Sequence, residues 1–382
     1  MVKLLNMFLQ AKKLMQVKTI KTTNSKERYM LFNSNGESVD VVNKYLKYKD
    51  SYGSARNTLK TYCYHLKLYF EYLEQSRLDF LDVNIDSMAN FLHWLKNPSG
   101  SISNLHLKPV ESKRSAKSIN IIVSVVLDFY DYLLRNSIYE GKITEQLKRE
   151  MSGSRRGYKG FLYHISKDKT YLAKTLKLKE PKKKPKTLSK EQVEALLDNC
   201  KNLRDRFLIS LLYESGMRIG EALSLWIEDF SLDGRKVQIR DRGEHENGAE
   251  IKTSNAERVI DISDNLINLF IDYISEYHDD NVDTNFVFIK LAGENKYQPM
   301  EYPDVDSLFK RLEKKTSIHA SAHMLRHTSL TELRRAGMKS EHLQRRAGHA
   351  DPNYTANTYY HPTEEDIRED WENVSSKNKK QL

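Results

Sequence analysis

The sequence contains few cysteines and no long apolar run. Its two cysteines, Cys63 and Cys200, are too few for a disulfide scaffold or a cysteine-based zinc module. Both lie in helical patterns, which favours reduced, packed side chains. No stretch approaches the roughly 20 apolar residues that cross a bilayer. Residues 1–16 also lack the sustained apolar region and cleavage site of a signal peptide. These absences favour a soluble protein inside the cell, without a membrane partner.

Positive charge is in excess. The 382 residues include 62 Lys and Arg against 52 Asp and Glu, which gives a net charge of +10 at pH 7. Such an excess favours a polyanionic partner, although composition alone does not separate nucleic acid from an anionic membrane. The length is sufficient for two domains that each have a core.

The first half of the chain has the periodicity of helices. Residues 1–37 are basic and irregular and close on a turn signal at 33–36. In the range 38–178, apolar residues recur at intervals of three and four, which predicts a small bundle of three or four helices. The best-defined apolar face, preceded by a candidate N-cap at Ser54, consists of Leu59, Tyr62, Leu66, Tyr69, Phe70 and Leu73.

A basic segment with two prolines separates the halves, and residues 179–187 within it are predicted to be the linker. The second half, 188–362, combines helices with short strands at 236–262 and at 286–289. A polar tail, 363–382, follows. The sequence thus predicts a mostly α fold in two domains, with a small β-hairpin or sheet in the second.

The helix boundaries of the second half are marked by local signals. Ser189 and Gln192 have the spacing of a capping box. Gly216 fits the position just after a helix, and Arg218 stands at the start of the next one. A later helix is expected to be capped by Ser321 and to end at Gly337.

Groups that can break a phosphodiester gather near the C-terminus. His323 and Arg326 are three residues apart, so a helix would place them on one face. His349 follows, and then the pair Tyr359 and Tyr360. A guanidinium matches phosphate oxygens, and a phenol can be a covalent nucleophile if its proton is removed. This set needs no metal for such a reaction.

These residues resemble the tyrosine recombinases, also called the phage integrase family. The hallmark of that family is H-x-x-R, then Gly-His, then a tyrosine about ten residues later, as in His323 to Arg326, His349 and Tyr359. The family also has an earlier arginine, which residues 214–222 match at Arg218, and a β-hairpin lysine, which 250–253 match at Lys252. The resemblance is detailed in the second half and extends to the first half in layout only.

The resemblance implies two transesterifications on DNA, without metal, ATP or cofactor. Arg218 and Arg326 would neutralise the scissile phosphate. His323 would take the tyrosine proton or bind the phosphate, and His349 would donate to a phosphate oxygen. Lys252 would protonate the leaving 5′-oxygen.

The nucleophile implied by the resemblance is Tyr359, which would form a 3′-phosphotyrosyl link. Tyr359 is followed by x-His, as in the family, with His361 in that place. Tyr360 would point about 100° away around a helix. Because the family spacing varies by one residue, Tyr360 stays the alternative.

The resemblance also implies a C-shaped clamp on duplex DNA with specific recombination sites, in the bacterial cytoplasm at the nucleoid. Two duplexes need four active sites, so a homotetramer is implied, and accessory recombination proteins are compatible with it. Residues 1–37 are either a DNA-contacting arm or a loosely ordered leader. Ile367 and Trp371 in the tail either fold back or dock into a neighbouring protomer. The basic residues predicted to contact DNA are Arg56, Lys60, Lys67, Arg155, Arg156, Lys182, Lys183 and Lys184.

Three other hypotheses compete with recombination. His323 and His327 have the i, i+4 spacing of a zinc-binding helix, but Met324 stands where a zinc protease has glutamate. A DNA-binding protein without catalysis would keep every basic feature. A relaxing topoisomerase of the tyrosine type would keep the chemistry and lose the specific site.

Overall fold

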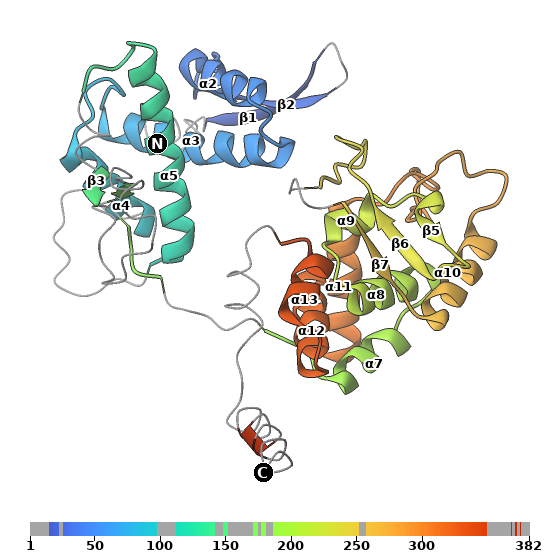
Figure 1. The fold of residues 1–382 in the computed structure, drawn as a ribbon. Helices are drawn as coiled ribbons and strands as arrows, with labels where there is room; N and C mark the ends of the chain where they lie inside the picture. Colours follow the sequence, from blue (N-terminus) through green and yellow to red (C-terminus); the bar gives the residue numbers. More distant parts are fainter. Residues whose placement is uncertain are drawn as a thin grey trace, which may run out of the picture. The chain divides into compact units, whose positions relative to one another are not determined.

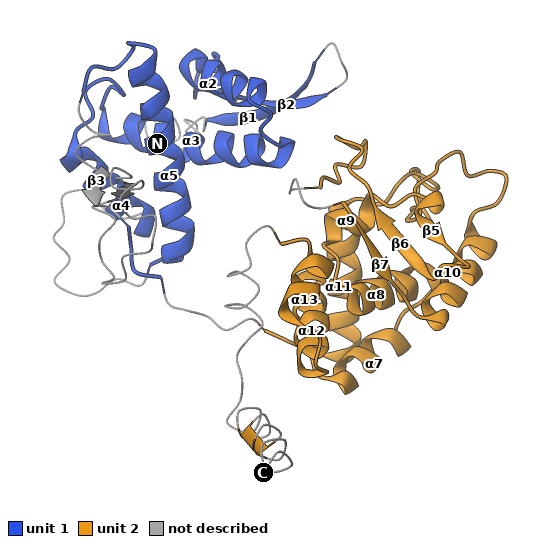
Figure 2. Cartoon of the chain, in the orientation of Figure 1, with its two compact units in different colours: residues 1–182 blue, residues 183–382 orange. Residues whose placement is uncertain are grey.

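The computed structural model describes residues 15–22, 26–97, 112–141, 148–151, 171–174, 177–180, 186–251, 257–349, 368, 371, 372 and 375. The chain forms two compact units, Met1–Lys182 and Lys183–Leu382, shown in different colours in Figure 2. The division between them falls within the segment 179–187. No described helix is long and apolar enough to span a membrane.

Unit 1 is mostly helical, as the sequence predicts. Its elements are β1 (Gln16–Lys21), β2 (Glu27–Phe32), α2 (Asp40–Ser51), α3 (Arg56–Ser76), α4 (Ile85–Lys96), α5 (Ala116–Arg135), β3 (Lys148–Met151) and β4 (Tyr171–Lys174), all but β4 labelled in Figure 1. The strands form two antiparallel pairs, β1 with β2 and β3 with β4.

The N-terminal hairpin corrects one expectation. Residues 1–37 are not irregular throughout, because β1 and β2 pair in register from Gln16 opposite Phe32 to Lys21 opposite Glu27. Leu31 is fully buried in the core of unit 1, and its backbone N–H donates to the Asn43 side chain of α2. The side chains of β1 are almost all exposed, so its sequence lacks the apolar–polar alternation that predicts a strand.

Aromatic side chains fill the core of unit 1. Tyr69 and Tyr130 are fully buried, and their hydroxyl oxygens lie 2.6 Å apart. The Tyr130 hydroxyl in turn donates to the Phe80 carbonyl at 2.8 Å. The predicted apolar face of α3 is buried except for Tyr62, which is partly exposed. Ser54, however, does not cap α3, because that helix begins at Arg56 with Ala55 as its N-cap.

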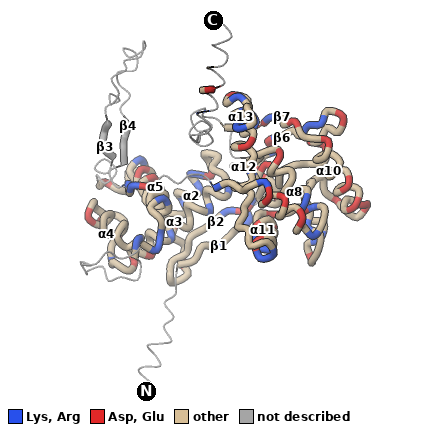
Figure 3. The backbone as a smooth tube through the Cα atoms, turned by 90° about the horizontal axis from the view of Figure 1, so that it is seen from below, with Lys and Arg blue, Asp and Glu red and all other residues tan. Residues whose placement is uncertain are grey.

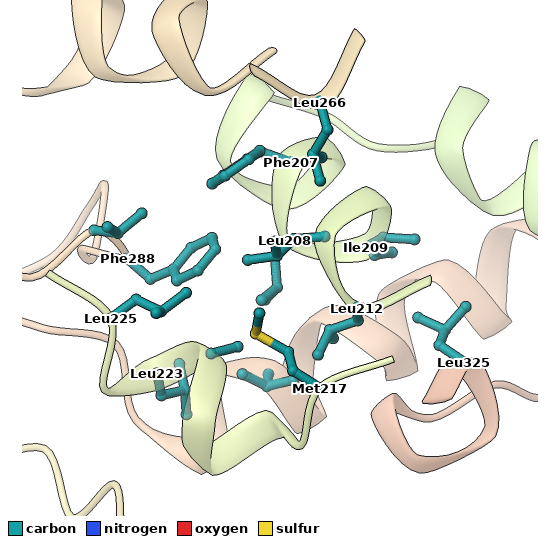
Figure 4. Packing of buried hydrophobic residues seen from close by; sticks show 14 of the residues in the cluster. Phe207, Leu208, Ile209, Leu212, Met217, Leu223, Leu225, Leu266, Phe288 and Leu325 are labelled. Carbon is teal, nitrogen blue, oxygen red and sulfur yellow. The ribbon is translucent and has the colours of Figure 1, made fainter. Parts of the chain in front are cut away.

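Unit 2 packs its helices around one buried helix, α8, and a three-stranded antiparallel sheet in the order β5-β6-β7. Its elements are α7 (Lys190–Asp198), α8 (Leu203–Ser215), α9 (Ile219–Leu223), η1 (Ile227–Asp229), β5 (Phe230–Ser231), β6 (Lys236–Ile239), β7 (Arg258–Asp261), α10 (Asp264–Tyr277), α11 (Tyr302–Thr316), α12 (Ala322–Arg335) and α13 (Ser340–Ala347). Figure 4 shows Phe207, Leu208 and Leu212 of α8 packed against residues from several other elements.

The local signals in unit 2 have the predicted effect. Ser189 and Gln192 form the capping box of α7, and the Ser321 hydroxyl accepts a hydrogen bond from Met324 N at the start of α12. Gly216 ends α8 with φ of 65°, in the left-handed region that glycine adopts readily. The range 286–289 differs from the prediction, because it makes two isolated β-bridges rather than a strand.

Side chains hold both ends of the segment that joins the units. Asn120 of α5 donates to the Leu178 carbonyl at 3.0 Å and to a Glu180 carboxylate oxygen at 2.7 Å, and it accepts from Leu178 N at 2.8 Å. At the other end, Leu188 N donates to the Thr328 hydroxyl of α12 at 2.9 Å. The connecting segment is therefore attached to α5 in unit 1 and to α12 in unit 2.

Candidate active site

Arg218 is held at the start of α9. The left-handed turn at Gly216 ends α8, and Arg218 follows in extended conformation. Its Nη1 donates to Glu221 Oε1 at 2.9 Å, and its Nη2 donates to the Gly348 carbonyl at 3.1 Å. The side chain is 27% exposed, so the guanidinium is fixed on one side and open to solvent on the other.

Arg326 lies one helical turn into α12 and is 2% exposed. Its Nη1 donates to the Gly216 carbonyl at 2.6 Å, and its Nη2 donates to the Ala347 carbonyl at 2.7 Å. Arg326 therefore ties the Gly216 turn to the C-terminal end of α13. Since Arg218 contacts the neighbouring Gly348 carbonyl, the two guanidinium groups meet at one place.

His349 directly follows the Gly348 turn and is largely buried. Its Nε2 lies 2.8 Å from Arg326 Nη2. Because a guanidinium can only donate, His349 Nε2 must accept, and the proton of the neutral ring is then on Nδ1. Burial, with the charges of Arg326, Arg218 and Arg258, lowers the pKa of His349 to about 3. His349 is therefore a neutral hydrogen-bond donor at pH 7.

His323 is an exposed residue in the first turn of α12. It lies on the same helix as Arg326, at the i, i+3 spacing that the sequence predicts. Its Nε2 is 2.8 Å from Nε2 of His327, which lies one turn later on the helix.

Two charged residues that sequence reasoning did not select connect these groups. Arg258 of β7 donates from Nη2 to Glu221 Oε2 at 2.8 Å and from Nη1 to Glu221 Oε1 at 3.1 Å. Its Nε donates to the Arg346 carbonyl at 2.7 Å. Burial opposes ionisation of Glu221, but its bonds to Arg258 and Arg218 outweigh this and hold the pKa of the carboxyl below its ordinary value. Glu221 thus stays charged between two arginines.

The alternation of side chains along β7 could have identified Arg258 as a buried residue. In β7 the inward positions are Arg258 and Ile260, which places a guanidinium on the apolar face of a short strand. A charge at such a position needs a buried partner. The partner, Glu221, is 37 residues earlier, so spacing alone does not identify it.

Several predicted residues lie outside the described residues. These are the proposed hairpin lysine, both candidate nucleophiles and five of the basic residues, namely Lys252, Tyr359, Tyr360, Arg155, Arg156, Lys182, Lys183 and Lys184. Among the residues that are described, no three His, Cys, Asp or Glu side chains are grouped so as to hold a metal ion.

The other three predicted DNA contacts lie on α3. Arg56 donates to Glu27 at 2.9 Å, and Lys67 is 3.7 Å from Glu71. Lys60 is exposed, with its Nζ 5.8 Å from the centre of the Tyr29 ring. Lys and Arg are interspersed with acidic residues along the helices of both units in Figure 3. Of the three, Lys60 has no acidic partner among the ion pairs described.

The second unit brings together two arginines and His349, with His323 on the same helix as Arg326, and such a set of side chains fits an enzyme that acts on phosphodiesters. The family model described as "Phage integrase family" matches residues 186–366, and that described as "Phage integrase, N-terminal SAM-like domain" matches residues 42–137. The chain belongs to the phage integrase family, that of the tyrosine recombinases. It is a tyrosine site-specific recombinase, an enzyme of DNA strand transfer.

Curated relatives cover nearly the whole chain. Transposase A from transposon Tn554 of Staphylococcus aureus is 36% identical over 343 residues, which are 90% of this chain and 93% of that protein. Tyrosine recombinase XerD of Staphylococcus haemolyticus is 26% identical over 340 residues, 86% of this chain and 96% of that protein.

Solved structures share the fold. The Tn1549 transposon integrase, in complex with transposon right end DNA, has a TM-score of 0.60 at 22% identity, over 88% of this chain and 99% of that one. The XerH site-specific recombinase, bound to its difH substrate before cleavage, has a TM-score of 0.57 at 19% identity, over 88% of this chain and 85% of that one.

Proposed function

We propose that this chain is the recombinase of a mobile genetic element and that it acts through the residues gathered around α12. The observation that carries this proposal is the meeting of Arg218 and Arg326 at the Ala347 and Gly348 carbonyls, beside His349. The site therefore concentrates positive charge where a phosphodiester would gain negative charge. Such fixed electrostatic stabilisation is usually the largest catalytic contribution.

The proposed reaction has two balanced steps. The Tyr359 oxygen attacks the scissile phosphorus, its proton passes to His323, and the 5′-oxygen leaves with a proton from Lys252. A 5′-hydroxyl of another strand then attacks the phosphotyrosyl link, and the protons return. Arg218, Arg326 and the Nδ1–H of His349 stabilise the charge on the non-bridging oxygens in both steps.

The proposal includes a C-shaped clamp on duplex DNA and a homotetramer that joins two specific sites, in the bacterial cytoplasm at the nucleoid. In unit 1, Lys60 is proposed as a direct phosphate contact of α3, with Arg56 and Lys67 exchanging their acidic partners for phosphate. Such contacts hold the protein in register without carrying sequence information. The basic residues 155–156 and 182–184 are proposed to add to this binding.

The tail is proposed to join protomers. Trp371 is 67% exposed, which leaves a large apolar side chain available. Unit 2 has a cavity of about 760 Å³ between α8, α10 and α12, with Leu266, Leu269 and Leu333 in its wall. This cavity is the proposed acceptor of a neighbouring tail. A cysteine crosslink between positions 371 and 269 should join two chains rather than close one.

A covalent trap tests the proposed chemistry. The protein is incubated in EDTA with a nicked suicide DNA that carries an end of its element, and the products are separated on a denaturing gel. A protein–DNA band that is lost in Tyr359→Phe and kept in Tyr360→Phe supports Tyr359 as nucleophile. The reverse result assigns the reaction to Tyr360. Tight binding without a band overturns the catalytic proposal, and relaxation of a supercoiled plasmid without sites would favour a topoisomerase.

A further inference from the structure

His327 is a buried histidine that the proposed reaction does not use. It lies one turn after His323 on α12 and is 6% exposed. The two rings are perpendicular, with an interplanar angle of 80° and centres 4.2 Å apart. Their Nε2 atoms are 2.8 Å apart, which is a hydrogen-bond distance. The buried ring thus contacts the exposed one through a specific pair of atoms.

That contact requires a single proton between the two nitrogens. One Nε2 carries a hydrogen and the other offers a lone pair, because two lone pairs or two N–H groups would repel each other. His327 stays neutral in this pair, since burial, His323 and Arg326 lower its pKa to about 4. A neutral His327 can therefore accept a hydrogen bond from His323 whether His323 is neutral or protonated.

We infer that His327 is a positioning residue that fixes the ring orientation and tautomer of His323. In this arrangement His323 Nε2–H donates to His327 Nε2, so His323 exchanges protons at its other nitrogen, Nδ1. The same hydrogen bond persists when Nδ1 takes a proton, and it is stronger then because the donor is charged. His327 thereby keeps His323 ready to accept a proton in one step and to return it in the next.

The helix makes this arrangement possible. Residues at i and i+4 face each other on a helix surface, and side chains point back towards the N-terminus. The ring of the buried His327 therefore contacts the ring of His323 in the first turn of α12. Its neighbours Arg326 and Thr328 are also buried, so the His327 side chain lies in a packed part of α12. An acceptor on the same helix restricts the rotation of the exposed His323 imidazole.

The test rests on the proposed role of His323 and uses a double-mutant cycle. The rate of covalent complex formation is measured in single turnover on the nicked suicide DNA, with DNA affinity and thermal stability measured in parallel. His327→Leu removes the hydrogen-bond acceptor of His323. His327→Gln keeps an amide oxygen that can accept from His323. Each variant is also combined with His323→Ala. Ser329→Ala, a buried change on the same helix, is the matched control.

The inference predicts that His327→Leu slows cleavage by roughly ten- to a hundredfold, part of the 10²–10⁴ that a positioned base contributes. His327→Gln should recover most of the rate, and Ser329→Ala should stay within about twofold of the native protein. In the His323→Ala background, His327→Leu should have almost no further effect, because its action passes through His323.

Two results would overturn the inference. One is a native rate in His327→Leu while His323→Ala is slow. The other is an equal loss from His327→Leu with and without His323, which would mean a purely structural role. If His323→Ala itself cleaves at the native rate, the proposed role of His323 fails instead, and the two failures are distinguishable.

Discussion

Glu221 and Arg258 are the residues on which the geometry of the candidate site depends most. Glu221 binds Arg218 and Arg258 together, and Arg258 also holds the Arg346 carbonyl next to the turn that carries His349. A buried ion pair contributes little net stability compared with apolar residues of similar size, but the loss of one partner is costly. The pair therefore specifies position more than stability.

Single and double substitutions separate these two effects. Arg258→Met is expected to lower the free energy of unfolding by about 3–5 kcal/mol, because Glu221 would remain charged and buried. The double variant Glu221→Met with Arg258→Met should recover much of that loss in urea unfolding. Covalent complex formation should remain slow in the double variant, since Arg218 has lost its carboxylate partner. A double variant with native stability and a native rate would show that the pair does not position Arg218.

The sequence revealed part of the site at this scale. The family resemblance selected His323, Arg326, His349 and Arg218, and the structure brings Arg218, Arg326 and His349 together. Arg258 and Glu221 could not be paired, since they meet only after β7 and α9 come together in the fold. The partnership of His323 and His327 was visible as an i, i+4 spacing, but spacing alone suggested a metal site.

At the scale of elements, the turn after α13 determines where His349 lies. Gly348 has φ of 62°, and a Cβ built there would lie 2.6 Å from Arg258 Nη1 and 3.4 Å from Arg218 Nη1. Glycine is needed at this position for two reasons, the left-handed backbone and the close approach of two guanidinium groups.

Gly348→Ala should therefore displace the arginines as well as strain the backbone. Gly337→Ala is the matched control. Gly337 also follows a helix and has a positive φ, but a Cβ built there would meet no neighbouring atom within 4 Å. Both variants are expected to lose about 1–2 kcal/mol of stability from backbone strain. Only Gly348→Ala should slow cleavage, by roughly a hundredfold, as after the loss of one stabilising donor. Equal rates in the two variants would contradict this account.

The elements themselves were predicted where one face is clearly buried. Helix α3 was recognisable from its apolar spacing, and α7 from its capping box. The β1–β2 hairpin was not predicted because the side chains of β1 are mostly exposed and the hairpin depends on strand pairing and on contacts of β2 with α2 and α3. Tertiary packing, which a local pattern does not record, decides such elements.

At the scale of the whole molecule, buried neutral histidines make stability depend on pH. Burial is the first cause that lowers the pKa of His327 to about 4 and of His349 to about 3. In the unfolded chain both titrate near ~6.5. Between about pH 6.5 and pH 4.5 the unfolded state thus binds more protons than the folded state, so stability must fall as pH falls.

Each of these histidines should contribute a slope of up to ~1.4 kcal/mol per pH unit in that window. Hydrogen exchange of α12 amides in urea, measured between pH 7.5 and pH 4.5, gives the stability of unit 2. In His327→Gln the slope of stability against pH should decrease by up to ~1.4 kcal/mol per pH unit, which is the contribution of one titrating histidine. A stability of unit 2 that does not change across this window would refute the prediction.

The two attachment points of the connecting segment also matter for protein engineering. Asn120 fastens Leu178 and Glu180 to the first unit, and Thr328 fastens Leu188 to the helix of His323 and Arg326. A chimera that grafts a different N-terminal unit onto the second unit loses Asn120 and its attachment, and it keeps the Leu188–Thr328 attachment unchanged if the junction falls before Leu188. A junction after Leu188 would place a foreign residue where Leu188 N–H donates to Thr328, and a proline there would remove that donor from α12.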